Sequence, residues 1–553
     1  MKIILSVLRF QVHLVGALAI LGCLAGMGTV EAALSHAPVF GDHMVLQRDR
    51  RVPVWGTADA GAHVIVTFGG SSAKGVADDQ GAWRVEIGPF PASVSPATLE
   101  IISNKGDRRE IADVLVGEVW VVSGQSNMQL PSASFIGKPN DPRVSTVADK
   151  NLEALINGAP YPKVRLFAAA MNNKPVPAAD MKWTPATHET LKTFSAQLGT
   201  MGVTLSRRLD VPVGLMLAAI GGSPSSRWLT PQAIEADAAC QEALAREWAK
   251  ISMEKEQAAY QEALKKFESE QATWSQLSDA ERKTLKAPGK PNPPVAPGTG
   301  RWPVGDLHEE VLKPMIGYGI RGVLWDQGES GAFIRGIDQF TLMGALFASW
   351  RKEWGQSEFP FVIVQKPSGG GCAFDASDPV YGWASDKFQP LPPAPPGDGK
   401  GREEMIRIAA EYSNIFLVPT SDLGGGLHPV NKFAYGMRAA RVIHGAVYGQ
   451  PEAWNGPTLE GTQVQGDKIR VRFRHVGQGL VARHTDTLQG FAIAGADKKF
   501  VWAHAVIDGD AVVVSAPSIP KPLYVRYAWA GSIPWANLFS KDGFPALSFR
   551  TDP

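Results

Sequence analysis

Three loops of the sequence carry residue types that could together perform acyl transfer. Ser126 ends the segment Val119-Trp-Val-Val-Ser-Gly-Gln-Ser126, and its hydroxyl could act as a nucleophile once a base removes its proton. Gly222 follows another apolar run, where a glycine lets a backbone N–H group approach a ligand oxygen. His428 follows the glycine run 424–426 and could serve as general base and then as general acid. Taken alone, each loop has a simpler explanation: Ser126 could cap a helix, Gly222 could lie in an ordinary turn, and His428 could be structural. The combination of the three favours serine-based acyl transfer.

These loops need a scaffold that brings them to one place, and the sequence between residues 111 and 450 predicts one. Apolar runs of strand length alternate there with stretches of helical period, as in a parallel sheet that helices cover on both faces. Because the carboxyl ends of parallel strands share one edge of the sheet, we expect the three loops to meet at that edge. The apolar runs occupy residues 118–122, 213–220, 322–325, 359–365 and 414–419.

Other parts of the chain have different patterns. Short β-branched runs between Gly, Asp and Pro turns predict β-sandwich domains at both ends of the chain, and alternation would direct Ile469, Val471 and Phe473 into a core. Apolar residues at helical spacing in a polar stretch predict a helical insertion, a surface hairpin rather than a partner-binding coiled coil. The predicted parts are signal peptide 1–33, N-terminal β domain 34–110, α/β domain 111–232 and 301–450, insertion with a Pro-rich return 233–300, and C-terminal β domain 451–553.

The first residues are typical of a secretory signal peptide. Lys2 and Arg9 precede the apolar run 14–27, and Val30-Glu-Ala32 offers the small residues that signal peptidase requires. The pattern predicts a secreted or periplasmic protein with no stable membrane insertion after cleavage. An uncleaved anchor is the alternative, although the apolar run is short for a membrane span. In the mature chain, Cys240 and Cys372 could form one disulfide bond.

Composition and spacing disfavour two other classes of protein. The 55 Lys and Arg residues against 54 Asp and Glu residues give a formal charge of +1, without the basic surplus typical of nucleic-acid-binding proteins. No cluster of His and Asp has the spacing of metal ligands, which disfavours a metal-dependent deacetylase. We therefore expect neither a nucleic-acid partner nor a metal ion.

Three separated blocks of the sequence match the pattern of one known family. The blocks are Gly117-Glu-Val-Trp…Ser-Gly-Gln-Ser-Asn-Met128, Gly322-Val-Leu-Trp-Asp-Gln-Gly-Glu-Ser330 and Leu427-His-Pro-Val-Asn-Lys432, with further similar segments at 40–47 and 534–538. They closely resemble the signature motifs of the sialate O-acetylesterase-like family, in the SGNH hydrolase superfamily. The resemblance implies an SGNH-type three-layer α/β/α parallel-sheet hydrolase domain with accessory β-sandwich domains. It also implies a carbohydrate esterase that removes acetyl groups from sugar hydroxyls without a cofactor.

The resemblance also implies a role for each matched residue. Ser126 corresponds to the nucleophile and His428 to the base. Gly222 and Gln327 join the N–H group of Ser126 as donors to the oxyanion. Because the loss of one oxyanion donor typically lowers the rate by about 10²–10³-fold, Gln327→Ala is expected to be severely impaired.

The sequence departs from the family pattern at the acidic member of the triad. The superfamily usually places an aspartate two or three residues before the histidine, where it orients and stabilises the imidazolium. Here Gly425 and Gly426 occupy those positions. Our hypothesis is that Asp326, at the end of a neighbouring strand, supplies the missing acid. Asp422 and the absence of any acid remain the alternatives.

The substrate is expected to be an acetylated oligosaccharide or polysaccharide. We favour a plant cell-wall polysaccharide such as xyloglucan or xylan, and a sialate 9-O-acetylesterase is the alternative. Arg227, beside Trp228, could bind a substrate carboxylate, although an exposed arginine there could equally be a solvated loop residue. We take both as candidate substrate-binding residues, and the many tryptophans weakly favour stacking on a polysaccharide. A noncatalytic glycan-binding protein with a decayed esterase site is the alternative of another class.

Overall fold

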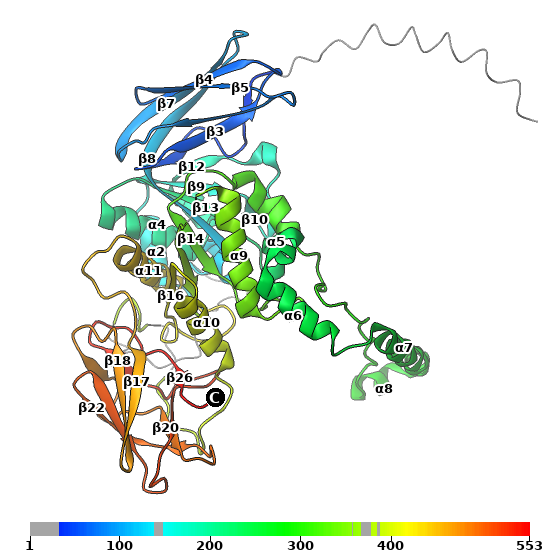
Figure 1. Ribbon diagram of the computed structural model, residues 1–553, viewed down its shortest axis with the longest axis vertical. Helices are drawn as coiled ribbons and strands as arrows, with labels where there is room; N and C mark the ends of the chain where they lie inside the picture. The colour runs from blue at the N-terminus through cyan, green and yellow to red at the C-terminus, as the bar shows by residue number, and fades with distance from the viewer. Residues whose placement is uncertain (1–32, 138–146, 357, 367–377, 384–386) are drawn as a thin grey trace, which may run out of the picture.

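The computed structural model describes residues 33–137, 147–356, 358–366, 378–383 and 387–553 (Figure 1). The predicted signal peptide, apart from Ala33, lies outside these residues, and so does Cys372. Among the described helices, none combines the length and the apolar character that crossing a bilayer requires.

The centre of the molecule is an 11-stranded mixed sheet built around the long strand β8, Arg108–Gly124. The carboxyl half of β8 pairs in parallel with one neighbour on each side, and the strands beyond them extend the sheet in both directions. The order is β12 (Trp183–Ala186), β9 (Tyr161–Ala168), β13 (Val213–Ala219), β8, β14 (Gly322–Asp326), β15 (Phe361–Val364) and β16 (Ile415–Val418). The predicted strand positions and the mixed α/β class are therefore confirmed.

Helices pack on both faces of this sheet, and the residues of β8 alternate between the two cores. Val119 and Val121 belong to a core that includes α9 (Gln339–Trp354), whereas Trp120 and Val122 belong to the core of α4 (Ala196–Leu209) and α11 (Lys432–Val442). Successive side chains of a strand point to opposite faces, so an unbroken apolar run fits a strand covered on both sides.

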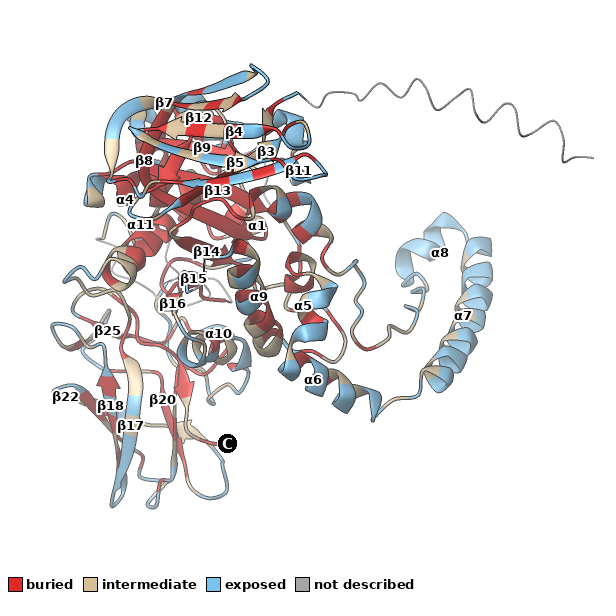
Figure 2. Ribbon diagram, turned by 45° about the horizontal axis from the view of Figure 1, so that its top comes forward, coloured by how far each residue is buried: buried red, intermediate tan, exposed pale blue. Residues whose placement is uncertain are grey.

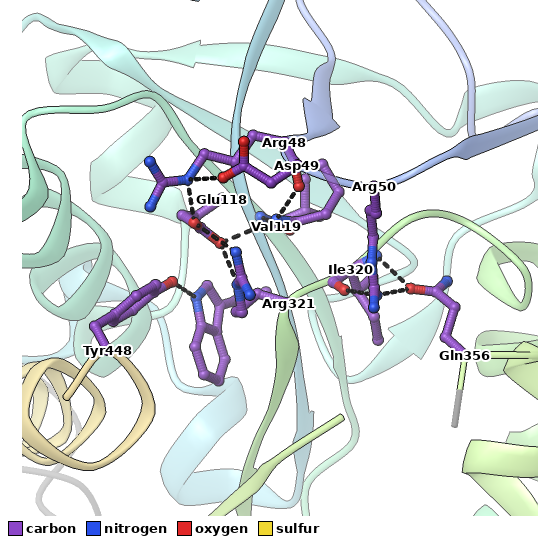
Figure 3. Close-up of polar contacts among 11 residues, drawn as sticks. Arg48, Asp49, Arg50, Glu118, Val119, Ile320, Arg321, Gln356 and Tyr448 are labelled. Carbon is purple, nitrogen blue, oxygen red and sulfur yellow. Dashed lines mark hydrogen bonds and ion pairs between the residues drawn. The ribbon is translucent and has the colours of Figure 1, made fainter. Parts of the chain in front are cut away.

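A buried carboxylate fixes β8 at the amino edge of its parallel pairing. Glu118 is fully buried and accepts hydrogen bonds from Arg321 at 2.7 and 3.0 Å, from Arg48 at 2.5 Å and from the Gln47 amide at 3.0 Å (Figure 3). Gln47 and Arg48 come from the N-terminal β region, whereas Arg321 precedes β14. One carboxylate therefore joins the N-terminal region to the central strands.

The amino half of β8 belongs to the N-terminal β region. It pairs with β2 (Val45–Gln47) and with β7 (Ser93–Ser103), which in turn pairs with β4 (His63–Phe68). The predicted boundary at residue 110 therefore lies inside a strand that both regions share. A separate sheet packs beside it, consisting of β1 (Ser35–His36), β3 (Val52–Thr57) and β6 (Ala82–Ile87).

The C-terminal region is built from antiparallel strands around a core of its own. One sheet has the order β17 (Thr458–Gln465), β18 (Lys468–Arg474), β23 (Ala511–Ser515) and β22 (His504–Asp508). A second sheet has the order β21 (Val501–Trp502), β20 (Phe491–Ala494), β24 (Tyr524–Tyr527) and β26 (Phe549–Arg550), and β19 (Leu480–Ala482) pairs with β25 (Leu538–Ser540). Ile469, Val471 and Phe473 are buried, as the alternation in the sequence predicted.

The insertion is helical, as predicted, and most of it lies on the surface. It comprises α5 (Pro231–Ala236), α6 (Ala238–Trp248), α7 (Met253–Gln276) and α8 (Asp279–Thr284). The first two helices contact α9, whereas α7 and α8 project away from the central sheet and are exposed (Figure 2). Ser278 and Glu281 form the predicted capping box at the start of α8.

Candidate active site

Ser126 lies at the carboxyl edge of the sheet, where the chain turns sharply out of β8. Gly124 has φ +133°, and a Cβ atom there would lie 2.1 Å from the backbone oxygen of Asp326, so this turn requires glycine. The next residue, Gln125, donates its backbone N–H to the same oxygen at 2.9 Å. The short helix α1 (Ser126–Gln129) then begins at the serine itself.

His428 meets Ser126 at this edge. Its Nε2 atom lies 3.0 Å from the Ser126 Oγ atom, although the two residues are 302 positions apart in the sequence. The distance is that of a hydrogen bond between a hydroxyl and a base that could take its proton. Of the predicted site residues, these two are brought into direct contact.

Asn127 ties the loop of His428 to the helix of Ser126. Its side-chain amide donates to the backbone oxygen of Leu427 at 3.0 Å, and its Oδ1 atom accepts from Lys432 Nζ at 2.6 Å. Leu427 and Lys432 lie on either side of His428 in the sequence, so these two contacts hold both sides of the loop that carries the imidazole. Sequence reasoning did not assign Asn127 or Lys432, although both residues lie inside the quoted motifs.

A cluster of buried charges lies behind the serine. Lys366 forms ion pairs with Asp326 and with Glu329, the latter at 2.9 Å. The oxygens of Glu329 also accept hydrogen bonds from Gln125 at 2.8 Å and Asn127 at 3.0 Å, the two residues that flank Ser126. The cluster therefore holds the backbone on either side of the candidate nucleophile.

Burial shifts the protonation equilibria of this cluster. Desolvation raises the pKa of Asp326, and the neighbouring Glu329 adds to the rise while Lys366 opposes it. Burial also lowers the pKa of Lys432 to about 7, although nearby carboxylates favour its charged form. Groups perturbed in this way gather at functional sites more often than elsewhere.

Each of the two candidate acids forms an ion pair with a buried cation. Asp326 is ion-paired with Lys366, whereas Asp422 accepts two hydrogen bonds from the guanidinium of Arg438 at 3.0 and 2.8 Å. Asp422 and Arg438 are both fully buried. Which acid, if any, supports the imidazole therefore stays a prediction.

The loop after β13 lies against the serine. A Cβ atom on Gly221 would be 3.4 Å from the Cβ atom of Ser126, which sets the two turns side by side. Gly221 donates its N–H to the Asn173 side chain at 2.5 Å. Gly222 has φ +72° and open space where a side chain would project. The predicted oxyanion glycine therefore lies in a turn adjacent to the nucleophile.

Gln327 does not have the orientation predicted for an oxyanion donor. Its amide nitrogen is directed at two backbone oxygens, that of Gly331 at 3.0 Å and that of Ser223 at 3.5 Å. Its amide oxygen accepts from Gln339 at 3.0 Å and from Ser225. The side chain thus joins the loop after β14 to the loop after β13, and it acts on the site through their positions.

The structure also corrects the predicted substrate contacts. Trp228 is fully buried, packs edge-on against Trp325 and donates its Nε1–H to Ser223, so it cannot stack on a sugar. Arg227 is only 18% exposed and forms two hydrogen bonds with Asp306, at 2.8 and 2.6 Å. Both residues stabilise the loop that carries Gly222.

Within the described part of the chain, no group of three or more His, Cys, Asp or Glu residues could hold a metal ion. Cys240 is a buried free thiol, and burial raises its pKa to about 12. The predicted partner of Cys240 in a disulfide bond, Cys372, is outside the described residues.

Known proteins resemble this chain in sequence and in fold. No family model matches the chain. The chain is 26% identical over 360 residues to the sialate O-acetylesterase of Rattus norvegicus, an alignment that covers 59% of each protein. It is 24% identical over 548 residues to the sialate O-acetylesterase of Homo sapiens, covering 89% of this chain and 87% of the human one. A solved structure of a carbohydrate acetylesterase from Xanthomonas citri has a TM-score of 0.68 at 24% identity, and the match covers 94% of this chain and 99% of that one.

The predicted resemblance is confirmed. In sequence the chain is similar to sialate O-acetylesterases, and in fold it is similar to a carbohydrate acetylesterase. These similarities support a sialate O-acetylesterase-like carboxylic ester hydrolase.

Proposed function

We propose that the protein is a serine carbohydrate O-acetylesterase of the SGNH type, which acts outside the cytoplasm after its signal peptide is removed. The observation that carries this proposal is the 3.0 Å contact between Ser126 Oγ and His428 Nε2 at the carboxyl edge of a parallel sheet. Ligands of α/β proteins bind at that edge. The similarity to named acetylesterases supports the same chemistry.

The reaction proceeds through an acetyl-enzyme. The Ser126 oxygen attacks the acetyl carbonyl carbon while His428 takes the hydroxyl proton. The tetrahedral intermediate then breaks its bond to the sugar oxygen, which leaves with the proton from His428. Water attacks the acetyl-enzyme with His428 again as base, and acetate departs as the serine recovers its proton.

Backbone groups stabilise the oxyanion of this intermediate. The N–H group of Ser126 and that of Gly222 are the donors we assign, because their two turns lie against each other. Gln327 supports both loops instead of donating to the substrate. Its amide fixes the loop after β13 through the Ser223 oxygen and the loop after β14 through the Gly331 oxygen.

Asp326 acts in this proposal as a positioning residue. Its carboxylate neutralises Lys366, and Lys366 binds Glu329, whose oxygens hold Gln125 and Asn127 beside the nucleophile. A buried negative charge near the site also favours the positive charge that His428 acquires during the reaction. The acid therefore contributes without a direct bond to the imidazole.

We propose an acetylated plant cell-wall polysaccharide, such as xyloglucan or xylan, as the substrate. Arg227, the cation considered for a sialic-acid carboxylate, is bound to Asp306 and is mostly buried, which favours a neutral sugar. The relatives named sialate O-acetylesterases make an O-acetylated sialic acid the second candidate.

Acetate release from a chromogenic acetyl ester by the wild type and by Ser126→Ala tests the activity. We expect loss of the nucleophile to lower kcat by roughly 10³-fold or more. Equal acetate release by the two proteins would contradict the assignment of Ser126. A wild type that binds glycan but releases no acetate would instead support the noncatalytic alternative. A panel of acetylated xylan, xyloglucan and sialic acid then ranks the substrates by kcat/KM.

A further inference from the structure

An aromatic pair lies on the surface of the loop region that precedes α9. The rings of Trp302 and Phe333 have their centroids 4.9 Å apart, with their planes inclined by 60°. The guanidinium of Arg301 lies 5.5 Å from the centroid of the Trp302 ring. Phe333 is 50% exposed and Trp302 is half-buried, unlike the fully buried Trp228. These two rings are therefore not part of the core.

The backbone holds Phe333 in a conformation that large side chains avoid. Its φ is +52°, a value that is a genuine outlier for a bulky residue. The neighbouring residues are fixed by two backbone hydrogen bonds, from Ser226 to Ala332 and from Arg335 to Thr299. Strain of this kind persists where the surrounding structure imposes it, most often at functional sites.

The absence of a side chain at Gly300 allows the Phe333 backbone to approach closely. A Cβ atom on Gly300 would lie 2.3 Å from the Phe333 backbone oxygen, so a side chain at residue 300 would displace this turn. Gly300 is two residues before Trp302, so the two ring-bearing segments are in direct contact. The fold thus fixes both rings relative to each other before any ligand binds, which reduces the entropy lost on binding.

Two connections join the pair to the loops of the candidate active site. Phe333 is four residues after Glu329, which contacts Gln125 and Asn127 beside the nucleophile. Four residues of chain span at most about 14 Å. The preceding residue, Ala332, accepts a hydrogen bond from Ser226 in the loop of Gly222. Two separate connections therefore tie the rings to the loops that surround Ser126.

We propose that Trp302 and Phe333 form a sugar-stacking subsite for the acetylated oligosaccharide, which binds a pyranose unit next to the unit that carries the acetyl group. This inference rests on the proposed esterase function. The C–H groups on the face of a pyranose ring carry partial positive charge and match the negative face of an aromatic ring. The Arg301 guanidinium, which lies over the Trp302 ring, offers N–H donors to the sugar hydroxyls.

The proposed subsite contributes to the binding of long substrates and does not contact small ones. In this proposal a chromogenic acetyl ester occupies only the region of the serine, whereas an acetylated xylohexaose also contacts the rings. Phe333→Gly removes the ring and also relieves the positive φ, so the loop is expected to keep its conformation. Trp302→Ala removes the second ring. Trp274→Ala, a half-exposed tryptophan near the far end of α7, is the matched control.

We expect Phe333→Gly and Trp302→Ala each to lower kcat/KM for the acetylated xylohexaose by roughly fivefold, mainly through KM, and to leave the small ester unaffected. The control variant keeps wild-type kinetics on both substrates. Unchanged kcat/KM for the hexaose in both ring variants would overturn the subsite, and so would an equal loss on the small ester.

A binding titration separates this inference from the proposed activity. Acetylated xylohexaose is titrated into Ser126→Ala with and without Phe333→Gly, so that the readout does not need catalysis. About fivefold weaker binding in the double variant supports the subsite even if the wild type releases no acetate. Equal affinity of the two proteins would overturn the subsite even if the esterase activity is demonstrated.

Discussion

Buried carboxylates lie at both ends of the part of β8 that pairs in parallel with its neighbours. The carboxylates at the two ends are bound by different cations. At the amino end, Glu118 is held by arginines and a glutamine. At the carboxyl end, Asp326 and Glu329 share Lys366 behind the candidate nucleophile. The first cluster joins segments of the fold, whereas the second surrounds a reacting group.

The pKa values of Glu118 and Asp326 shift in opposite directions, whereas that of Glu329 is lowered like that of Glu118. Burial by itself would raise the pKa of Glu118, but hydrogen bonds and charge from Arg321, with those from Gln47 and Arg48, hold that pKa below its usual range. For Asp326, burial outweighs the favourable charge of Lys366, and the pKa is raised. A guanidinium matches both carboxylate oxygens at once, whereas an ammonium is a point charge. The amino end is therefore organised for stability, and the carboxyl end retains groups whose protonation can change.

The largest expected effect is at the amino end. Glu118→Gln leaves the nearby arginines without their carboxylate, and we expect the free energy of unfolding to fall by about 2–4 kcal/mol. The lower part of that range applies because Arg48 and Arg321 are 23% and 32% exposed and remain partly solvated. Urea unfolding measures the change, and Glu411→Gln in an exposed pair with Arg407 is the matched control. A loss of activity in the folded variant, with stability unchanged, would contradict the contrast between the two ends.

At the carboxyl end, we expect Asp326→Asn to lower kcat by roughly tenfold and to reduce the free energy of unfolding less than Asp422→Asn does, because burial opposes the charge of Asp326 and Lys366 keeps Glu329 as its second carboxylate. Asp422→Asn is the matched comparison, since it leaves the buried guanidinium of Arg438 without its carboxylate. That variant should be less stable and keep its specific activity when folded. Esterase assays and urea unfolding of both variants measure the two effects. A fully active Asp326→Asn would exclude a role of this acid in the chemistry.

The smallest expected effect is a pH dependence of stability from Lys432. Its folded pKa is about 7 against an ordinary value of 10.5, so between those pH values the unfolded chain binds more protons than the folded protein. The free energy of unfolding should therefore rise with pH across this window, by about 1 kcal/mol per pH unit from this group. Lys432→Met should remove that slope in urea unfolding at pH 7, 8 and 9. Parallel profiles for the two proteins would show that the lysine does not titrate there.

Much of this arrangement could be predicted from the sequence because it depends on local patterns. Runs of strand length with apolar residues on both faces identified the parallel strands, and Gly124 indicated the turn that presents Ser126. The meeting of Ser126 with His428 followed from the rule that such loops converge at one edge of the sheet.

What the sequence did not reveal depends on contacts between distant segments. Lys366 lies two residues after the end of β15, where a lysine is usually exposed to solvent. Its burial becomes evident only when Asp326 and Glu329 are seen beside it. The orientation of Gln327 is set by Ser225 and Gln339, which lie 102 and 12 positions away. Trp228 illustrates a second obstacle, because the same residue type fills a core and binds a sugar.

The length of β8 has a consequence for dissecting the molecule. A shortened chain that began at residue 111 would cut into this strand and would lose Gln47 and Arg48, so the Glu118 carboxylate would be left with fewer donors. The amino half of β8 would also lose the partners that cover Val114 and Val116, which would leave an unprotected apolar edge prone to aggregation. The N-terminal β region is therefore an integral part of the fold, because it contains the first half of the strand that leads to the nucleophile.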